Sequence, residues 1–93
     1  MIDWNDVNST LADSEMQWEE TKLDVIKVLG YLEAMRCEKA IRRAKWAITR
    51  AKIAKDKNRS MFALLFVIFA LIQSRTYQRI AAKSLKHVEN SDS

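Results

Sequence analysis

Side chains that can do chemistry are few in this chain and stand far apart. His87 is the single histidine and Cys37 is the single cysteine. A zinc or iron site needs several such ligands at short spacings, and neither residue has a second ligand at such a spacing. The sequence therefore predicts no metal site and no cofactor.

The carboxylates and hydroxyls also lack a catalytic arrangement. Glu19 and Glu20 are neighbours in the chain, so on a helix they point in different directions and are not placed as an acid/base pair. A serine nucleophile needs a nearby base, and a phosphate-binding loop needs several glycines where this chain has only Gly30. We predict that the protein is not an enzyme, has no small-molecule substrate and acts by making contacts.

Helix is the only regular structure that the apolar pattern favours. The chain has 93 residues, no proline and one glycine, and its apolar residues recur three and four positions apart. We predict an all-α fold with two long helices at about 10–57 and about 60–88, the first of which could be broken near Gly30. They would form either a helical hairpin or an extended helical arm with a short apolar helix of the membrane type.

Serine residues are the expected N-caps of these helices. Ser14 and Gln17 fit a capping box, in which each side chain hydrogen-bonds to the backbone of the other residue. Ser60 follows a polar stretch and is the expected N-cap of the second helix.

Charge divides the chain into four segments of a single helical unit. An acidic arm, residues 1–35, has a net charge of −6, and a basic helix, residues 36–59, has a net charge of +8. An apolar belt covers residues 60–77, and residues 78–93 form an amphipathic end with a frayed tail. The adjoining acidic and basic blocks favour back-folding within one chain or head-to-tail pairing between chains, although two solvated helix faces give the same pattern.

A stripe of small residues follows the basic helix at alternating spacings of three and four. This heptad spacing keeps one face toward a neighbouring helix, and small side chains let the two backbones approach closely. The alternative is that alanine is there only for its helix propensity. The predicted helix-packing seam consists of Cys37, Ala40, Ala44, Ala47, Ala51 and Ala54.

Cationic residues and a tryptophan cover another part of the same helix. Such a surface can neutralise nucleic-acid phosphates and stack on a base, or lie against anionic lipid headgroups, or be a solvated face. The sequence contains no nucleic-acid recognition motif that would decide between these interpretations. The predicted basic surface consists of Arg42, Arg43, Lys45, Trp46 and Arg50.

The belt is apolar on every side of a helix, so it needs lipid or protein around it. Its uncharged part, residues 60–74, is about 22 Å long as a helix, whereas a bilayer core is about 30 Å thick. Extension to Tyr77 requires Arg75 to reach the interface with its long side chain. The residues expected to make the apolar contacts are Phe62, Leu65, Phe66, Ile68, Phe69 and Ile72.

Three functions remain open at this point. The first is a small helical interaction subunit that is embedded in a membrane through residues 60–77 and binds partner helices of a larger complex. Its N-terminal side would be cytoplasmic, because residues 42–59 hold eight basic residues against four in residues 75–86. The second is a soluble, cytoplasmic inhibitor or assembly factor whose belt is buried in a homo-oligomer or a complex. The third is a nucleic-acid binder that uses the basic helix.

Overall fold

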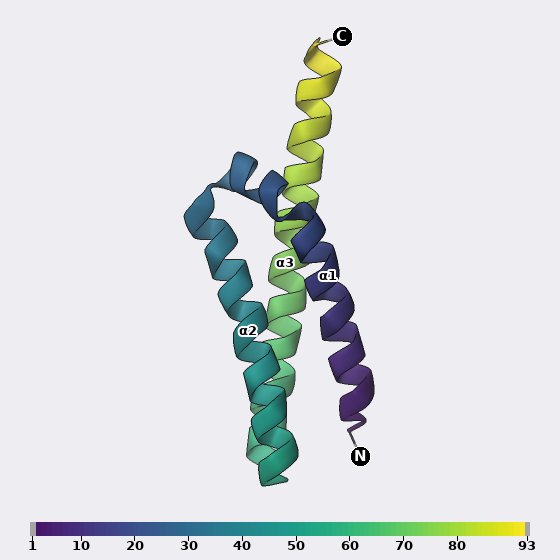
Figure 1. Ribbon diagram of the computed structural model, residues 1–93, viewed down its shortest axis with the longest axis vertical. Coiled ribbons are helices and arrows are strands. Elements are labelled where there is room, and N and C mark those ends of the chain that lie inside the picture. Colours follow the sequence, from purple (N-terminus) through teal and green to yellow (C-terminus); the bar gives the residue numbers. More distant parts are fainter. Residues whose placement is uncertain (1, 93) are drawn as a thin grey trace.

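The computed structural model describes residues 2–92 and consists of three helices (Figure 1). They are α1 (Trp4–Leu29), α2 (Tyr31–Ala54) and α3 (Lys57–Asp92), and residues 2–92 contain no strand. The predicted all-α fold is confirmed. Its two predicted helices become three because the first one is broken.

The side chains of residues 87–92 lie outside this description. His87 and most of the frayed tail predicted for residues 89–93 fall in that part of the chain. The backbone of α3 continues to Asp92, four residues beyond the predicted helix end at about residue 88.

The first helix begins at Trp4, earlier than predicted, because Asp3 is its N-cap. The Asp3 carboxylate accepts hydrogen bonds from the backbone N–H groups of Asn5, at 3.1 Å, and Asp6, at 3.4 Å. An aspartate at this position satisfies backbone donors that the first turn leaves free. The capping box predicted at Ser14 is wrong, since Ser14 lies inside α1 and is buried.

Gly30 separates α1 from α2, so the predicted break near this residue is confirmed. Its backbone has φ 98° and ψ 162°, a conformation that residues with a Cβ atom rarely adopt. The Gly30 N–H donates to the carbonyl of Ile26 at 2.9 Å, and its carbonyl accepts from the N–H of Ala34 at 3.2 Å. The chain therefore changes direction at one residue while the backbone groups of both helix ends stay paired.

The connection between α2 and α3 is equally short. Lys55 adopts a left-handed conformation, with φ 52°, and its N–H donates to the carbonyl of Ala51 at 3.0 Å. The Asp56 carboxylate then accepts from the N–H of Asn58 at 3.1 Å, so α3 starts at Lys57. Ser60 is not the N-cap that the sequence predicts, because its N–H already donates to the carbonyl of Asp56 within the helix.

The helices form an elongated bundle of 55 × 23 × 16 Å. In Figure 1, α1 and α3 run in one direction and α2 runs back between their ends, while the C-terminal turns of α3 extend past both neighbours. α2 and α3 thus form the predicted helical hairpin, and α1 packs on both of them. The buried apolar core consists of Leu11, Trp18, Val25, Ala34, Cys37, Ile41, Ala44, Ile48, Val67, Ala70 and Ala81.

Polar contacts between helices surround this core. Glu15 of α1 accepts from the Lys45 ammonium of α2 at 3.0 Å, and Lys22 of α1 is paired with Glu38 of α2. The acidic arm therefore folds back on the basic helix within one chain. On the other side, the Tyr77 hydroxyl of α3 donates to the Glu33 carboxylate of α2 at 2.8 Å.

Candidate functional site

α3 turns its small side chains toward the other two helices. Ala63, Val67, Ala70, Ser74 and Ala81 are buried, and each is at most 5% exposed. Their spacings of four, three, four and seven residues keep them on one face of the helix. Small residues on this face bring the backbone of α3 close to its neighbours and leave the large apolar residues elsewhere.

Those large residues form the exposed surface of the belt. The six belt residues predicted to make apolar contacts are between 43% and 61% exposed, and Met61 beside them is 64% exposed. Exposed apolar surfaces of this kind are typical of proteins that contact a membrane or another protein there, and in water they favour aggregation. The six residues are Phe62, Leu65, Phe66, Ile68, Phe69 and Ile72.

The predicted seam of α2 lies only partly in the core. Cys37, Ala44 and Ala51 are buried, Ala40 and Ala47 are half-buried, and Ala54 is exposed. The remaining core positions of α2 are Ala34, Ile41 and Ile48. The face in contact with the other helices is therefore rotated toward the two isoleucines, which bury more apolar area than alanines would.

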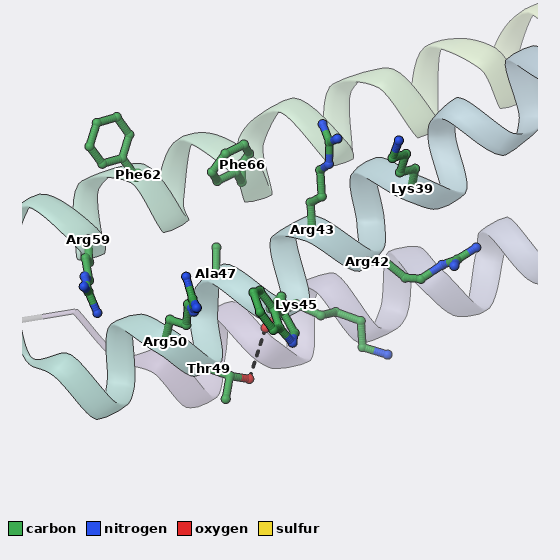
Figure 2. Close-up of a pocket in the computed structure, with 11 residues that line it drawn as sticks. Lys39, Arg42, Arg43, Lys45, Ala47, Thr49, Arg50, Arg59, Phe62 and Phe66 are labelled. Carbon is green, nitrogen blue, oxygen red and sulfur yellow. Dashed lines mark hydrogen bonds between the residues drawn. The ribbon is translucent and has the colours of Figure 1, made fainter.

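The predicted basic surface is divided between two sides of α2. On the side of α1, Lys45 pairs with Glu15 at 3.0 Å, and Arg42 pairs with Glu38 at 3.4 Å. On the opposite side, Arg43 and Arg50 extend toward α3 (Figure 2). Residues that are adjacent in sequence, such as Arg42 and Arg43, thus meet different surroundings.

A groove of about 760 Å³ runs along this surface, over the outer face of α2 and the adjoining face of α3. Ala47 lies in its lining between the longer side chains. In Figure 2, Phe62 and Phe66 belong to α3, the helix toward which Arg43 and Arg50 of α2 extend. We call this hollow the cationic groove; its lining consists of Lys39, Arg42, Arg43, Lys45, Trp46, Ala47, Thr49, Arg50, Arg59, Phe62 and Phe66.

The cations on the α3 side of the groove lack acidic partners inside the chain. Among the side chains of residues 2–86, no carboxylate forms an ion pair with Lys39, Arg43, Arg50 or Arg59. The Arg50 guanidinium instead lies over the Trp46 ring, 4.4 Å from its centroid. The groove therefore carries positive charge next to the apolar belt.

Titratable groups elsewhere in the bundle are shifted by their partners. The hydrogen bond from Lys22 lowers the pKa of Glu38, against the opposing effect of burial, and the same hydrogen bond raises the pKa of Lys22. Burial, with a smaller effect of Glu33, raises the pKa of the Cys37 thiol to about 12. A thiol that is buried and protonated at neutral pH is a poor nucleophile. Nowhere in the described part of the chain do three or more His, Cys, Asp or Glu side chains come together as a possible metal site.

Three features of this arrangement were not predicted from the sequence. Lys39 and Arg59 belong to the groove with Arg43, but the sequence reading placed neither in the basic surface. Trp18 is fully buried in the core, and its position seven residues from both Leu11 and Val25 was an available signal. The presence of Arg43, Phe62 and Phe66 in one groove had no local signal, because it depends on how α2 packs on α3.

By length and composition, one stretch of the described chain is able to cross a membrane. It covers Lys57–Lys86 of α3, and 22% of its apolar window is buried inside the bundle. Comparison of the chain with family models, curated proteins and solved structures finds no match.

Proposed function

We propose that the protein is a small, non-enzymatic helical interaction subunit that is embedded in a membrane through residues 60–77. In this role the exposed face of the belt contacts lipid and the partner helices of a larger complex. If the belt spans the bilayer, the N-terminal side, with its concentration of basic residues before the belt, would face the cytoplasm.

One observation carries this proposal: α3 places small residues against its neighbours and large apolar residues outside. Ala63 and Ala70 are at most 1% exposed, whereas Phe69 is 58% exposed. This distribution is typical of membrane helices, whose packing uses small residues while the surroundings are as apolar as leucine. In water, the same exposed surface would favour association or aggregation.

The charged neighbours of the belt limit how it can enter lipid. Arg43 and Arg50 of α2 line the same groove as Phe62 and Phe66. Charged side chains are costly at the centre of a bilayer but are accommodated at its interface, where long basic side chains reach the headgroups. An intact bundle therefore fits best with the belt in the apolar region and α2 at the level of the headgroups.

The charged surfaces of α1 and α2 favour a second candidate. Both helices carry exposed ion-pairing residues, such as Lys45 with Glu15, that suit water. In this alternative the chain is a soluble, cytoplasmic partner-binding protein, such as an inhibitor or assembly factor. The belt is then covered by a second copy or by another protein.

Membrane fractionation of two matched variants tests the proposal. Ile68→Gln/Ile72→Gln changes exposed residues of the belt, 51% and 60% exposed, and leaves its buried face intact. Leu23→Gln/Leu32→Gln is the control, because these leucines are 72% and 75% exposed but lie on α1 and α2. Neither variant changes the net charge, so any difference in membrane retention between them comes from where the replaced apolar side chains lie.

We expect the wild type and the control to remain with membranes after an alkaline carbonate wash, and the belt variant to be released. Retention of the belt variant would contradict a lipid contact at this face. A wild type that is soluble without detergent as one discrete oligomer, measured by analytical ultracentrifugation, would favour the second candidate. Circular dichroism of each purified variant checks that its helices are preserved.

A further inference from the structure

We propose that the cationic groove binds the phosphate headgroup of an anionic phospholipid. This inference rests on the proposed membrane function and specifies the lipid class that the protein selects. It concerns the side of α2 that faces α3, where Arg43 and Arg50 line the same groove as Phe62 and Phe66.

The two sides of α2 differ in how their cations are paired. On the α1 side of the groove, Lys45 is paired with Glu15, and Arg42 is paired with Glu38, which Lys22 also contacts. On the α3 side, no carboxylate among the side chains of residues 2–86 is paired with Arg43 or Arg50. The groove is thus complementary to an anion supplied from outside the chain.

The arginines of the groove are spaced along α2 and the start of α3. Two arginines seven residues apart on α2 lie about two turns, or roughly 10 Å, apart along one side of the helix. Arg59 of α3 adds a third guanidinium to the same lining. Guanidinium groups bind phosphate oxygens through paired N–H donors, so the groove is able to hold a phosphodiester between neighbouring arginines.

The apolar side of the groove continues into the belt. Phe62 and Phe66 belong both to the groove and to the belt, so the apolar surface continues without interruption from the cations to Ile72. A phospholipid has the same order of parts, with an anionic headgroup joined to hydrocarbon chains. Trp46, which is 65% exposed beside Arg50, has the amphipathic ring that concentrates at the headgroup level of membranes.

This continuity favours lipid over nucleic acid. Single-stranded nucleic acid would also offer phosphates to the arginines and bases to Trp46. It would leave Leu65, Phe69 and Ile72 exposed, however, because its polar backbone cannot cover a long apolar surface. A lipid satisfies the cations and the belt together.

Liposome flotation of the full-length chain tests the inference. Two kinds of liposome are compared, one of phosphatidylcholine alone and one of phosphatidylcholine mixed with phosphatidylglycerol. Arg43→Gln/Arg50→Gln removes two charges from the groove, and Lys52→Gln/Arg79→Gln removes two charges from exposed residues outside its lining. We expect the groove variant to lose roughly 30-fold in partitioning onto the mixed liposomes, and the control to lose less than about 3-fold.

Equal losses of partitioning in the two charge variants would overturn the inference, and so would equal partitioning of the wild type onto both kinds of liposome. It would also be overturned if a single-stranded oligonucleotide displaced the wild type from mixed liposomes and the groove variant failed to bind that oligonucleotide. Failure of the proposed function is recognised separately with Ile68→Gln/Ile72→Gln. That variant should lose partitioning onto both kinds of liposome. If it partitions like the wild type, the belt does not enter lipid, whatever the arginines do.

Discussion

The hydroxyl groups of Ser14 on α1 and Ser74 on α3 lie 3.3 Å apart in the interior of the bundle, where the two side chains are 5% and 0% exposed. The Ser74 hydroxyl is also within 3.2 Å of the Leu71 carbonyl, to which it donates. A buried polar pair of this kind fixes the register of α1 along α3, because sliding either helix would leave a hydroxyl unpaired.

A double-mutant cycle measures this contact. In Ser14→Ala, Ser74 keeps its bond to the Leu71 carbonyl, so the loss of stability should be small, about 0.5–1.5 kcal/mol. Ser14→Ala/Ser74→Ala should lose less than the sum of the two single variants, with a coupling of about 1 kcal/mol in urea unfolding. Additive losses would mean that the two hydroxyls do not stabilise each other.

The backbone of Gly30 gives a second prediction. A Cβ atom added there would have no heavy atom within 4 Å, so Gly30→Ala creates no collision. The alanine would still be strained at φ 98°, and we expect a loss of about 1–3 kcal/mol in the free energy of unfolding.

A D-alanine at the same position separates backbone strain from the added methyl group. It accepts positive φ, so the D-alanine variant should be at least as stable as the wild type. The chain is accessible by synthesis, because Cys37 allows ligation of a 1–36 fragment to a 37–93 fragment. If both alanine isomers destabilise equally, the conformation of Gly30 is not the reason for the break.

Much of the helical architecture follows from the sequence, but the helix starts do not. The spacing of apolar residues and the position of Gly30 were sufficient to predict helices and a break. Asp3 and Asp56 compete as N-caps with Ser14 and Ser60, and aspartate and serine are both good caps. The choice depends on the chain path, because Ser14 is buried against a residue sixty positions away.

The contact surfaces, too, could be predicted from the sequence only in part. The exposed belt could be predicted from composition, since no helix of a small bundle can bury residues on every side. The face that α3 turns inward could not, because it depends on the packing of α1 and α2. In α2, Cys37, Ala44 and Ala51 fit two overlapping heptad stripes, and the larger side chains of Ile41 and Ile48 determine which stripe is buried.

The pair formed by Lys22 and Glu38 predicts how stability depends on pH. Its hydrogen bond lowers the pKa of Glu38 below the ordinary value of 4.5, so the folded state favours the ionised carboxylate. This contribution is complete above pH 4.5 and is lost as the pH falls through the lowered pKa. The raised pKa of Lys22 affects stability at high pH. Its contribution to stability is complete below pH 10.5 and is lost as the pH rises through the raised pKa.

Urea unfolding over a series of pH values tests this prediction. Glu38→Gln removes the titrating group, so its stability should fall less steeply on acidification than that of the wild type. Glu20→Gln is the matched control, since Glu20 is an exposed glutamate of α1. Parallel acid profiles for the wild type and Glu38→Gln would rule out this pair as a source of the pH dependence.

Cys37 reports whether the bundle remains closed on a membrane. Its thiol is 1% exposed, and burial raises its pKa from 9.0 to about 12. At neutral pH the thiolate fraction is then roughly 1,000-fold smaller than in the unfolded chain, so a maleimide should react far more slowly with the folded protein than with the protein in urea.

The same reaction on phosphatidylcholine liposomes distinguishes two ways of entering lipid. If α3 contacts lipid only with the outer face of the belt, its inward face still covers Cys37 and labelling stays slow. If α3 leaves α1 and α2 to cross the bilayer alone, Cys37 loses that cover and labelling approaches the rate in urea. We expect slow labelling, because separation would expose the buried side chains of Ile41 and Ile48 together with the thiol. Fast labelling on liposomes with slow labelling in buffer would show that the closed bundle is not the membrane-bound form.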